Sequence, residues 1–435
     1  MSEYPPLKSH RLPSVALFMI PFLCASFIVA QIILKPVSFP FADDWLLLDY
    51  LNPDQKVHIP QLMQLTNGHN YLITKLILIF FSDVFGAKTL TAFALFNVLL
   101  AFASAILLLR KLIKRNHNSL SIVLIITVIF FNFKQAQNFN MISSAHFIHS
   151  LFCISAYISI ENSKSRNRRW IPLVVAPFTG GFGVTLLLLE AYISVRLFFA
   201  NNKPRELLSL PACVIILILS YGVNFAAGNN INNISNSGNF QSIDNAITHP
   251  WFLPNFLLSL LGSQFTPSSK YMSLTSQVFG LIFLILIYKV KGQILRNTVL
   301  IHLLFIVIES MLMFSLSGYN GTTASIQNAY SNRYVTSTSL IAIILVVSIK
   351  DNRVIRFKKS ILATLLVLSL FSGMKSGLEW VGLRHSQSVS LERLCYGESD
   401  EDKQECVNLA FSQSFFSDKL TFEKELNRYL EIQRS

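Results

Sequence analysis

Residues 13–34 have the sequence PSVALFMIPFLCASFIVAQIIL, an apolar run without a charged side chain that follows Lys8 and Arg11. Its length matches the ~20 residues that a helix needs to cross the hydrocarbon core of a bilayer. No small-residue cleavage site follows it, so we interpret the run as a retained anchor rather than a cleaved signal. The first segment therefore predicts a membrane protein.

The composition agrees with this prediction along most of the chain. Of the 435 residues, 52% are hydrophobic and only 14% are charged, with 36 Phe, which excludes an ordinary soluble globular protein. The net charge is +13. However, the basic residues cluster in short loops between apolar runs, as in membrane topology rather than in a nucleic-acid-binding surface. We expect membrane lipids as the surroundings and no nucleic acid as a partner.

The basic clusters also predict the topology, because short loops rich in Lys and Arg stay on the cytoplasmic side. We expect an all-α polytopic membrane protein with about eleven transmembrane helices, a cytoplasmic N-terminus and an outer C-terminus. Residues 71–86 are interpreted as an interfacial helix, and residues 251–264 as a re-entrant or horizontal helix because they are short for a crossing. The predicted crossings are 13–34, 88–109, 118–133, 146–161, 171–199 (out and back), 206–226, 273–289, 298–317, 334–349 and 360–374.

This topology divides the chain into a transmembrane domain, residues 1–374, and a small outer tail, residues 375–435. The first outer loop, residues 35–87, contains Phe41-Ala-Asp43-Asp44-Trp45. Two adjacent carboxylates resist simultaneous ionisation, which suits one of them to proton abstraction. Alternatively, the pair binds a divalent cation such as Mg²⁺ or Mn²⁺, or an Asp caps the helix that follows. These alternatives remain open at the level of the residues.

Other unusual polar residues are expected on the same outer face. His69 either caps a helix or donates to a phosphate, and Arg333 either anchors a helix at the interface or binds a phosphate bidentately. Glu190 and Glu309 are second-line candidates, because an acid inside an apolar run usually faces a cavity or a partner. The outer candidates besides the acidic pair are Trp45, His69, Asn70, Lys75, Asn138, Thr179, Arg333 and Tyr334.

The tail contains Cys395 and Cys406, eleven residues apart in a polar stretch. Disulfides persist in oxidising compartments, so an outer location makes a bond between these two cysteines credible.

The arrangement resembles the GT-C superfamily of polytopic glycosyltransferases, and most closely the bacterial proteins that glucosylate O-antigen. Asp43-Asp44-Trp45 is similar to the acidic motif of their first outer loop, and Ser331-Asn-Arg333-Tyr334 to a later Ser-x-Arg-Tyr element. Residues 178–183 loosely resemble a helix break of that group. Asn67-Gly-His69-Asn70 keeps only the histidine of another element, with Asn70 in place of the usual arginine.

The resemblance implies inverting transfer of a hexose, with glucose as the specific expectation, at the periplasmic face of the bacterial inner membrane. The donor would be a polyprenyl-phosphate sugar and the acceptor a glycan or lipid-linked glycan, such as the O-antigen of lipopolysaccharide. Asp43 or Asp44 would act as general base, in a transfer that is metal-tolerant or metal-independent. Arg333, His69 and Lys75 would hold the phosphate, and Trp45 and Tyr334 would stack on a sugar. The alternative is a transporter or flippase for a lipid-linked glycan, which should carry polar residues on both faces.

Overall fold

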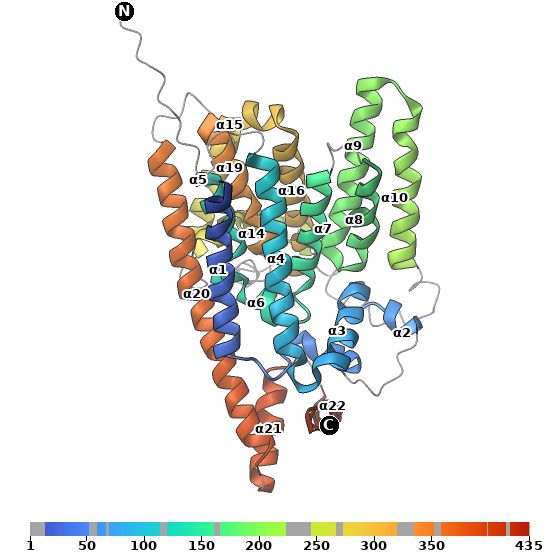
Figure 1. The fold of residues 1–435 in the computed structure, drawn as a ribbon, viewed down its shortest axis with the longest axis vertical. Coiled ribbons are helices and arrows are strands. Elements are labelled where there is room, and N and C mark those ends of the chain that lie inside the picture. The colour runs from blue at the N-terminus through green and yellow to red at the C-terminus, as the bar shows by residue number, and fades with distance from the viewer. Residues whose placement is uncertain are drawn as a thin grey trace, which may run out of the picture.

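The fold is known from a computed structural model, which describes residues 14–51, 59–66, 69–113, 120–160, 166–222, 245–266, 273–319, 335–351, 358–397, 399–414 and 418–434. Within these ranges the regular structure is helical and no strand occurs (Figure 1). Two isolated β-bridges join Ala42 to Ser414 and Thr66 to His69. The prediction of an all-α protein is confirmed.

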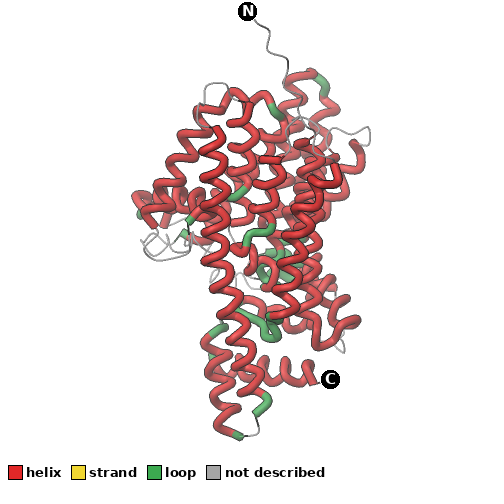
Figure 2. Tube along the Cα trace, turned by 60° about the vertical axis from the view of Figure 1, so that its left-hand side comes forward, coloured by secondary structure: helices red, strands yellow, loops and turns green. Residues whose placement is uncertain are grey.

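Most helices lie side by side in one bundle (Figures 1 and 2). The main bundle helices are α1 (Ser14–Leu34), α4 (Thr89–Ile113), α5 (Leu120–Phe130), α7 (His146–Ile160), α9 (Thr185–Asn201), α10 (Ser209–Leu217), α15 (Ser273–Arg296), α16 (Thr298–Gly318), α19 (Leu340–Asp351) and α20 (Lys358–Cys395). The shorter or peripheral helices are α2 (Ile59–Met63), α3 (Leu72–Phe85), α6 (Ala136–Asn140), α8 (Trp170–Val175), α14 (Leu253–Gly262), α18 (Val335–Thr338), α21 (Asp400–Ser412) and α22 (Lys419–Arg434).

Several of these helices can cross a membrane by length and composition. Within the described residues, five helical stretches meet that requirement, and four further apolar helices are shorter. The predicted number of about eleven crossings is therefore not confirmed, although a membrane protein is indicated. The five stretches are Leu72–Ile113, Phe182–Asn201, Pro204–Gly222, Leu274–Arg296 and Thr298–Ser315.

Helices of the bundle expose large apolar side chains on the outer surface. Val214 and Ile215 on α10 expose more than half of their surface, and Leu281 and Ile285 on α15 about half. A contiguous exposed apolar surface marks contact with a membrane or a partner. With the span lengths above, these faces are best explained by lipid.

The short run at residues 251–264 forms α14, which packs against the first half of α15. A Cβ on Gly262 would lie 1.9 Å from the carbonyl oxygen of Ser276, and one on Gly280 would lie 2.1 Å from that of Leu258. The two backbones therefore touch in antiparallel order, which only glycine permits at these positions. Residues 253–262 thus form a helix that lies antiparallel to α15.

The predicted interfacial helix appears as α3, and it is separate from α4. Gly86 ends α3 in a left-handed conformation, with φ of 51°, and a short 3₁₀ turn, η2 (Gly86–Lys88), follows. The chain therefore turns before α4 begins, and α3 lies near one end of the bundle (Figure 1). We call this end, which carries α2, α3, α21 and α22, the loop end; it is at the bottom of Figure 1.

A second, smaller hydrophobic core occupies the loop end. It joins the first loop to the tail, which are more than 300 positions apart in sequence. The first loop contributes the 3₁₀ helix η1 (Asp43–Leu51), whose Trp45 ring lies 5.0 Å from Phe422 and 5.8 Å from Tyr429 between ring centres. The tail thus packs on the acidic loop instead of standing free in solvent.

Helix α20 connects this small core to the bundle. It has 38 residues without interruption, about 57 Å at 1.5 Å per residue, and passes through the predicted domain boundary at residue 374 (Figure 2). A disulfide between Cys395 and Cys406 joins its end to α21. The pairing predicted from the sequence is thus present in the structure.

Replacing both cysteines, Cys395→Ser with Cys406→Ser, is expected to destabilise the loop end. Closing a loop of eleven residues stabilises a fold by about 3 kcal/mol, mainly by restricting the unfolded chain. Limited proteolysis in detergent should cleave the variant in residues 396–434 much faster than the wild type. Equal cleavage rates would show that the bond contributes nothing, and Cys213→Ser, a free thiol in the bundle, is the control.

Candidate active site

The acidic turn at residues 41–44 begins in an unusual backbone conformation. Ala42 has a φ of 54°, in the left-handed region that non-glycine residues rarely occupy. The Asp44 N–H then donates to the Phe41 carbonyl at 3.0 Å, which closes the turn and starts η1. Such a conformation persists only where the surroundings enforce it, and it clusters at functional sites.

The Asp44 carboxylate points into the protein and is 2% exposed. Its Oδ1 accepts the backbone N–H of Ser143 at 2.7 Å, in the turn just before α7. Asp44 therefore does accept a backbone N–H near the start of a helix. That helix is α7, about 100 positions later in the sequence, and not the helix that directly follows Asp44. Capping and a catalytic role are compatible here, because the bond orients the carboxylate beside the residues described next.

A histidine and a tyrosine bond to the same peptide, and a second histidine lies beside both rings. The Ser143 carbonyl accepts the Tyr71 hydroxyl at 3.2 Å and the His146 Nδ1–H at 2.7 Å. The His69 ring lies 5.5 Å from the His146 ring and 5.9 Å from the Tyr71 ring. The backbone bridge between Thr66 and His69 fixes the chain that presents His69. Residues from the first loop, the turn before α7 and α7 itself thus form one cluster.

The backbone of Gly180 lies directly against the His146 side chain. It lies in the break between α8 and α9, where the backbone passes through two 3₁₀ turns, η5 (Ala176–Phe178) and η6 (Gly181–Val184). Its φ is 141°, and a Cβ there would lie 2.6 Å from the His146 Cβ. The helix break predicted around residues 178–183 is therefore present, and its glycine leaves room for the imidazole.

The tail contributes a charge that the sequence did not single out. Arg384 of α20 is 1% exposed, and its guanidinium lies 4.1 Å above the Phe41 ring. Burial lowers the pKa of Arg384 to about 10, and the negative charge of Asp44 acts in the opposite direction. Because Arg384 is more than 300 residues from the loop, only the folded chain reveals this proximity.

Together these groups can accept a proton and stabilise a negative charge that develops nearby. A buried carboxylate oriented by an N–H can accept a proton, and imidazoles can donate hydrogen bonds to an anion. The Phe147 ring lies beside His146 and packs on the rings of Phe182 and Phe314, at 6.0 and 5.8 Å between ring centres. An apolar group therefore borders the cluster. The cluster consists of Asp44, His69, Tyr71, Ser143, His146, Gly180 and Arg384.

Two predicted binding residues are instead used by the fold. The Trp45 ring is 2% exposed and lies between tail aromatics, so it cannot stack on a sugar in this conformation. The Lys75 ammonium donates to the carbonyls of residues 61, 62 and 64 at 3.2, 3.3 and 2.6 Å, which occupies its three protons. In this conformation both side chains serve the fold, because the tail packs on Trp45 and the segment at α2 accepts the hydrogen bonds of Lys75.

Asn70, Asn138 and Thr179 are also engaged in buried structural bonds. Asn70 donates to the Ser220 carbonyl at 2.5 Å and accepts the Leu72 N–H at 3.0 Å. Asn138 donates to Gln135 and Thr336 at 2.9 and 2.7 Å, and Thr179 bonds Ser150 at 2.7 Å within the helix break. These residues connect the elements around the cluster rather than line it.

The other predicted residues lie outside what the structure describes. Arg333 and Tyr334 fall in the undescribed range 320–334, and the side chain of Asp43 is likewise not described. Among the described side chains, no three of the types His, Cys, Asp and Glu converge on a point where they could hold a metal ion.

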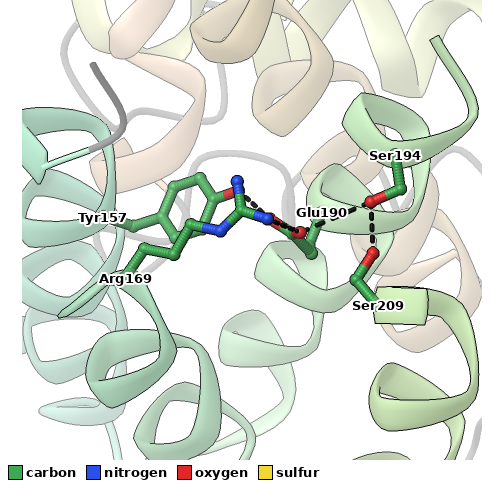
Figure 3. Close-up of polar contacts among 5 residues, drawn as sticks. All are labelled: Tyr157, Arg169, Glu190, Ser194 and Ser209. Carbon is green, nitrogen blue, oxygen red and sulfur yellow. Dashed lines mark hydrogen bonds and ion pairs between the residues drawn. The ribbon is translucent and has the colours of Figure 1, made fainter. Parts of the chain in front are cut away.

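Glu190, the second-line acid, lies in a separate buried network (Figure 3). Arg169 donates to its carboxylate at 2.7 Å, Tyr157 donates to the other oxygen, and Ser194 donates at 3.4 Å. Ser194 in turn bonds Ser209 of α10. The network in Figure 3 links α7, the 3₁₀ helix η4 (Arg166–Arg169), α9 and α10, so it holds the bundle together and the Glu190 carboxylate is occupied.

Glu190→Ala is expected to lower the stability by about 3 kcal/mol, because it leaves the buried charge of Arg169 unpaired. Thermal unfolding in detergent measures the loss. The double variant Arg169→Met with Glu190→Ala should be less destabilised than Glu190→Ala alone, since no buried charge remains. A single variant as stable as the wild type would show that the pair does not support the bundle.

Comparison with protein-family models, with characterised proteins and with solved structures finds no match to this chain.

Proposed function

We propose that this protein is a membrane glycosyltransferase that moves a hexose from a polyprenyl-phosphate donor to a cell-surface glycan. In its most specific form, the sugar is glucose and the acceptor is O-antigen. One observation carries the proposal: the buried Asp44 and His146 both bond to Ser143, His69 lies 5.5 Å from His146 between ring centres, and Arg384 lies over Phe41 of the same acidic turn. Transfer to a hydroxyl from a phosphate-linked sugar needs a base for the hydroxyl proton and groups that stabilise the leaving phosphate, and these residue types can supply both.

The chemistry divides between an acidic and a basic part. A carboxylate of the Asp43–Asp44 pair accepts the proton of the acceptor hydroxyl, whose oxygen attacks the anomeric carbon. The bond from that carbon to the phosphate breaks, and polyprenyl phosphate leaves with the electron pair. Attack from the face opposite the leaving group inverts the configuration, and a positioned general base contributes about 10²- to 10⁴-fold to such a step.

The leaving phosphate gains negative charge, so fixed positive groups lower the barrier. Arg333 and His69 are the residues we assign to the phosphate. His69 is partly exposed and stands at the rim of the cluster, while the buried Asp44 lies deeper. This order suits a donor that reaches the cluster from the lipid and an acceptor hydroxyl that reaches the carboxylates.

We place the reaction at the periplasmic face of the bacterial inner membrane. The cluster and the disulfide-bonded tail share the loop end of the bundle, and a structural disulfide is expected in an oxidising compartment. The distribution of the basic loops supports a cytoplasmic N-terminus.

Chromatography of surface polysaccharide from cells with and without the gene tests the proposal. The glycan from cells with the gene should carry one additional hexose per repeating unit, linked as a side branch. Identical glycans would refute the proposed acceptor class. Loss of the entire polymer without the gene would favour the alternative of a transporter for a lipid-linked glycan.

A further inference from the structure

The tail is hydrogen-bonded to the acidic turn at Ala42, the residue with the left-handed backbone conformation. The Ala42 N–H donates to the Gln413 carbonyl at 3.0 Å, and Ala42 forms its β-bridge with Ser414. Gln413 follows α21, which the disulfide joins to α20. The left-handed conformation of Ala42 is therefore enforced from the tail, more than 300 residues away.

Arg384 of α20 adds to these bonds. It donates to the Gln413 side-chain oxygen at 3.0 Å and to the Phe39 carbonyl at 3.4 Å, while its guanidinium covers the Phe41 ring. One side chain thus contacts both the segment before the carboxylates and the tail residue bonded to Ala42. We call Arg384 and Gln413 the tail clamp.

The clamp is more than packing, because it includes a charge that is costly to bury. Arg384 is 1% exposed, and its bonds to neutral oxygens do not neutralise it. An apolar side chain would fill the same space without that desolvation cost. The cost is offset if the guanidinium faces a carboxylate that must stay ionised, and Asp44 is the carboxylate that acts on it.

We propose that Arg384 and Gln413 are positioning residues for the acidic pair, so that the C-terminal tail is part of the catalytic unit. Gln413 and the Arg384 bonds hold the turn so that Asp44 faces Ser143. The positive charge of Arg384 favours the ionised form of Asp44. This inference rests on the proposed function for its catalytic part only, because the clamp itself is a structural statement.

The other ionisable groups around Asp44 define what a pH experiment can report. His146 belongs to α7, His69 and Tyr71 precede α3, and Asp43 is adjacent in η1. Among the groups around Asp44, Arg384 is the one expected to stay positively charged throughout pH 5 to 9. A positive neighbour favours the ionised carboxylate, so removing it moves the acidic limb of the pH–rate profile to higher pH by roughly one unit.

Three variants separate the charge of the clamp from its bonds. Arg384→Met should lower transfer at neutral pH at least tenfold, shift the acidic limb upward, and speed amide hydrogen exchange in residues 39–51. Arg384→Lys keeps the charge and should restore the position of the acidic limb while exchange remains fast. Gln413→Ala should speed exchange without moving the limb.

Arg428→Met is the matched control. Arg428 also joins the tail to η1, through a half-exposed ion pair with Asp49, but it is far less buried than Arg384. Its loss should leave the exchange of residues 39–44 and the acidic limb as in the wild type. Unchanged exchange and an unchanged limb in Arg384→Met would overturn the inference.

The outcomes distinguish the clamp from the enzyme. If the wild type transfers no sugar, the proposed function fails, and exchange alone still decides whether the tail holds the turn. If transfer occurs but the Arg384 variants alter neither exchange nor the pH profile, the function stands and the clamp fails. If Arg384→Met does not fold, the hydrogen exchange and the pH–rate profiles of Arg384→Lys and Gln413→Ala decide whether the clamp positions the acidic pair.

Discussion

Asp44→Asn is expected to reduce sugar transfer by about 10²- to 10⁴-fold, the usual contribution of a general base. Asparagine has the shape of aspartate and keeps an oxygen to accept the Ser143 N–H. It therefore preserves the turn but cannot take up a proton at neutral pH. Transfer of labelled hexose from a polyprenyl-phosphate donor in membranes measures the effect, with the amount of folded protein measured in parallel.

Asp43→Asn tests the second carboxylate in the same assay, and Asp49→Asn is the control. Asp49 lies in the same 3₁₀ helix, but its side chain is half exposed and pairs with Arg428. Its substitution should change transfer less than twofold. Full activity in both Asp43→Asn and Asp44→Asn would contradict the assignment of the acidic pair.

Gly180→Ala should lower transfer by about two orders of magnitude while leaving the bundle folded. The added Cβ would lie 2.6 Å from His146, and the φ of 141° is one that alanine rarely adopts. His146 must then move away from the Ser143 carbonyl and His69. A displacement of about 1 Å in a catalytic cluster costs ~10²-fold in rate.

Gly292→Ala in α15 is the matched control for this substitution. No atom lies within 4 Å of a Cβ at Gly292, and alanine is favoured over glycine in a helix interior. The control should therefore keep its transfer rate and unfold at the same temperature as the wild type or higher. Equal rates in Gly180→Ala and the wild type would show that His146 has no part in the reaction.

The features that the sequence could predict are those encoded by neighbouring residues. The apolar runs predict helices, and the glycines and the proline at 177–183 predict the break that the structure contains. The acidic turn and His69 stand out because polar residues are scarce in this chain. Local patterns of this kind depend on a few consecutive residues and survive whatever the tertiary contacts are.

The features that it could not predict depend on partners far away in the chain. Trp45 and Lys75 looked available because the tail and α2, which cover or bind them, have no visible pairing signal in the sequence. Arg384 looked like an ordinary charge on a polar helix for the same reason. Likewise, counting charges predicts a side for each loop, but the number of crossings also depends on how short helices such as α5 pack.

Purified protein in liposomes, given a polyprenyl-phosphate hexose and an acceptor glycan that lacks the side branch, tests the central claim most directly. The account predicts that labelled hexose appears on the glycan with inverted anomeric configuration, and that Asp44→Asn reduces this product at least 100-fold. Movement of the donor across the bilayer without any labelled glycan would contradict it.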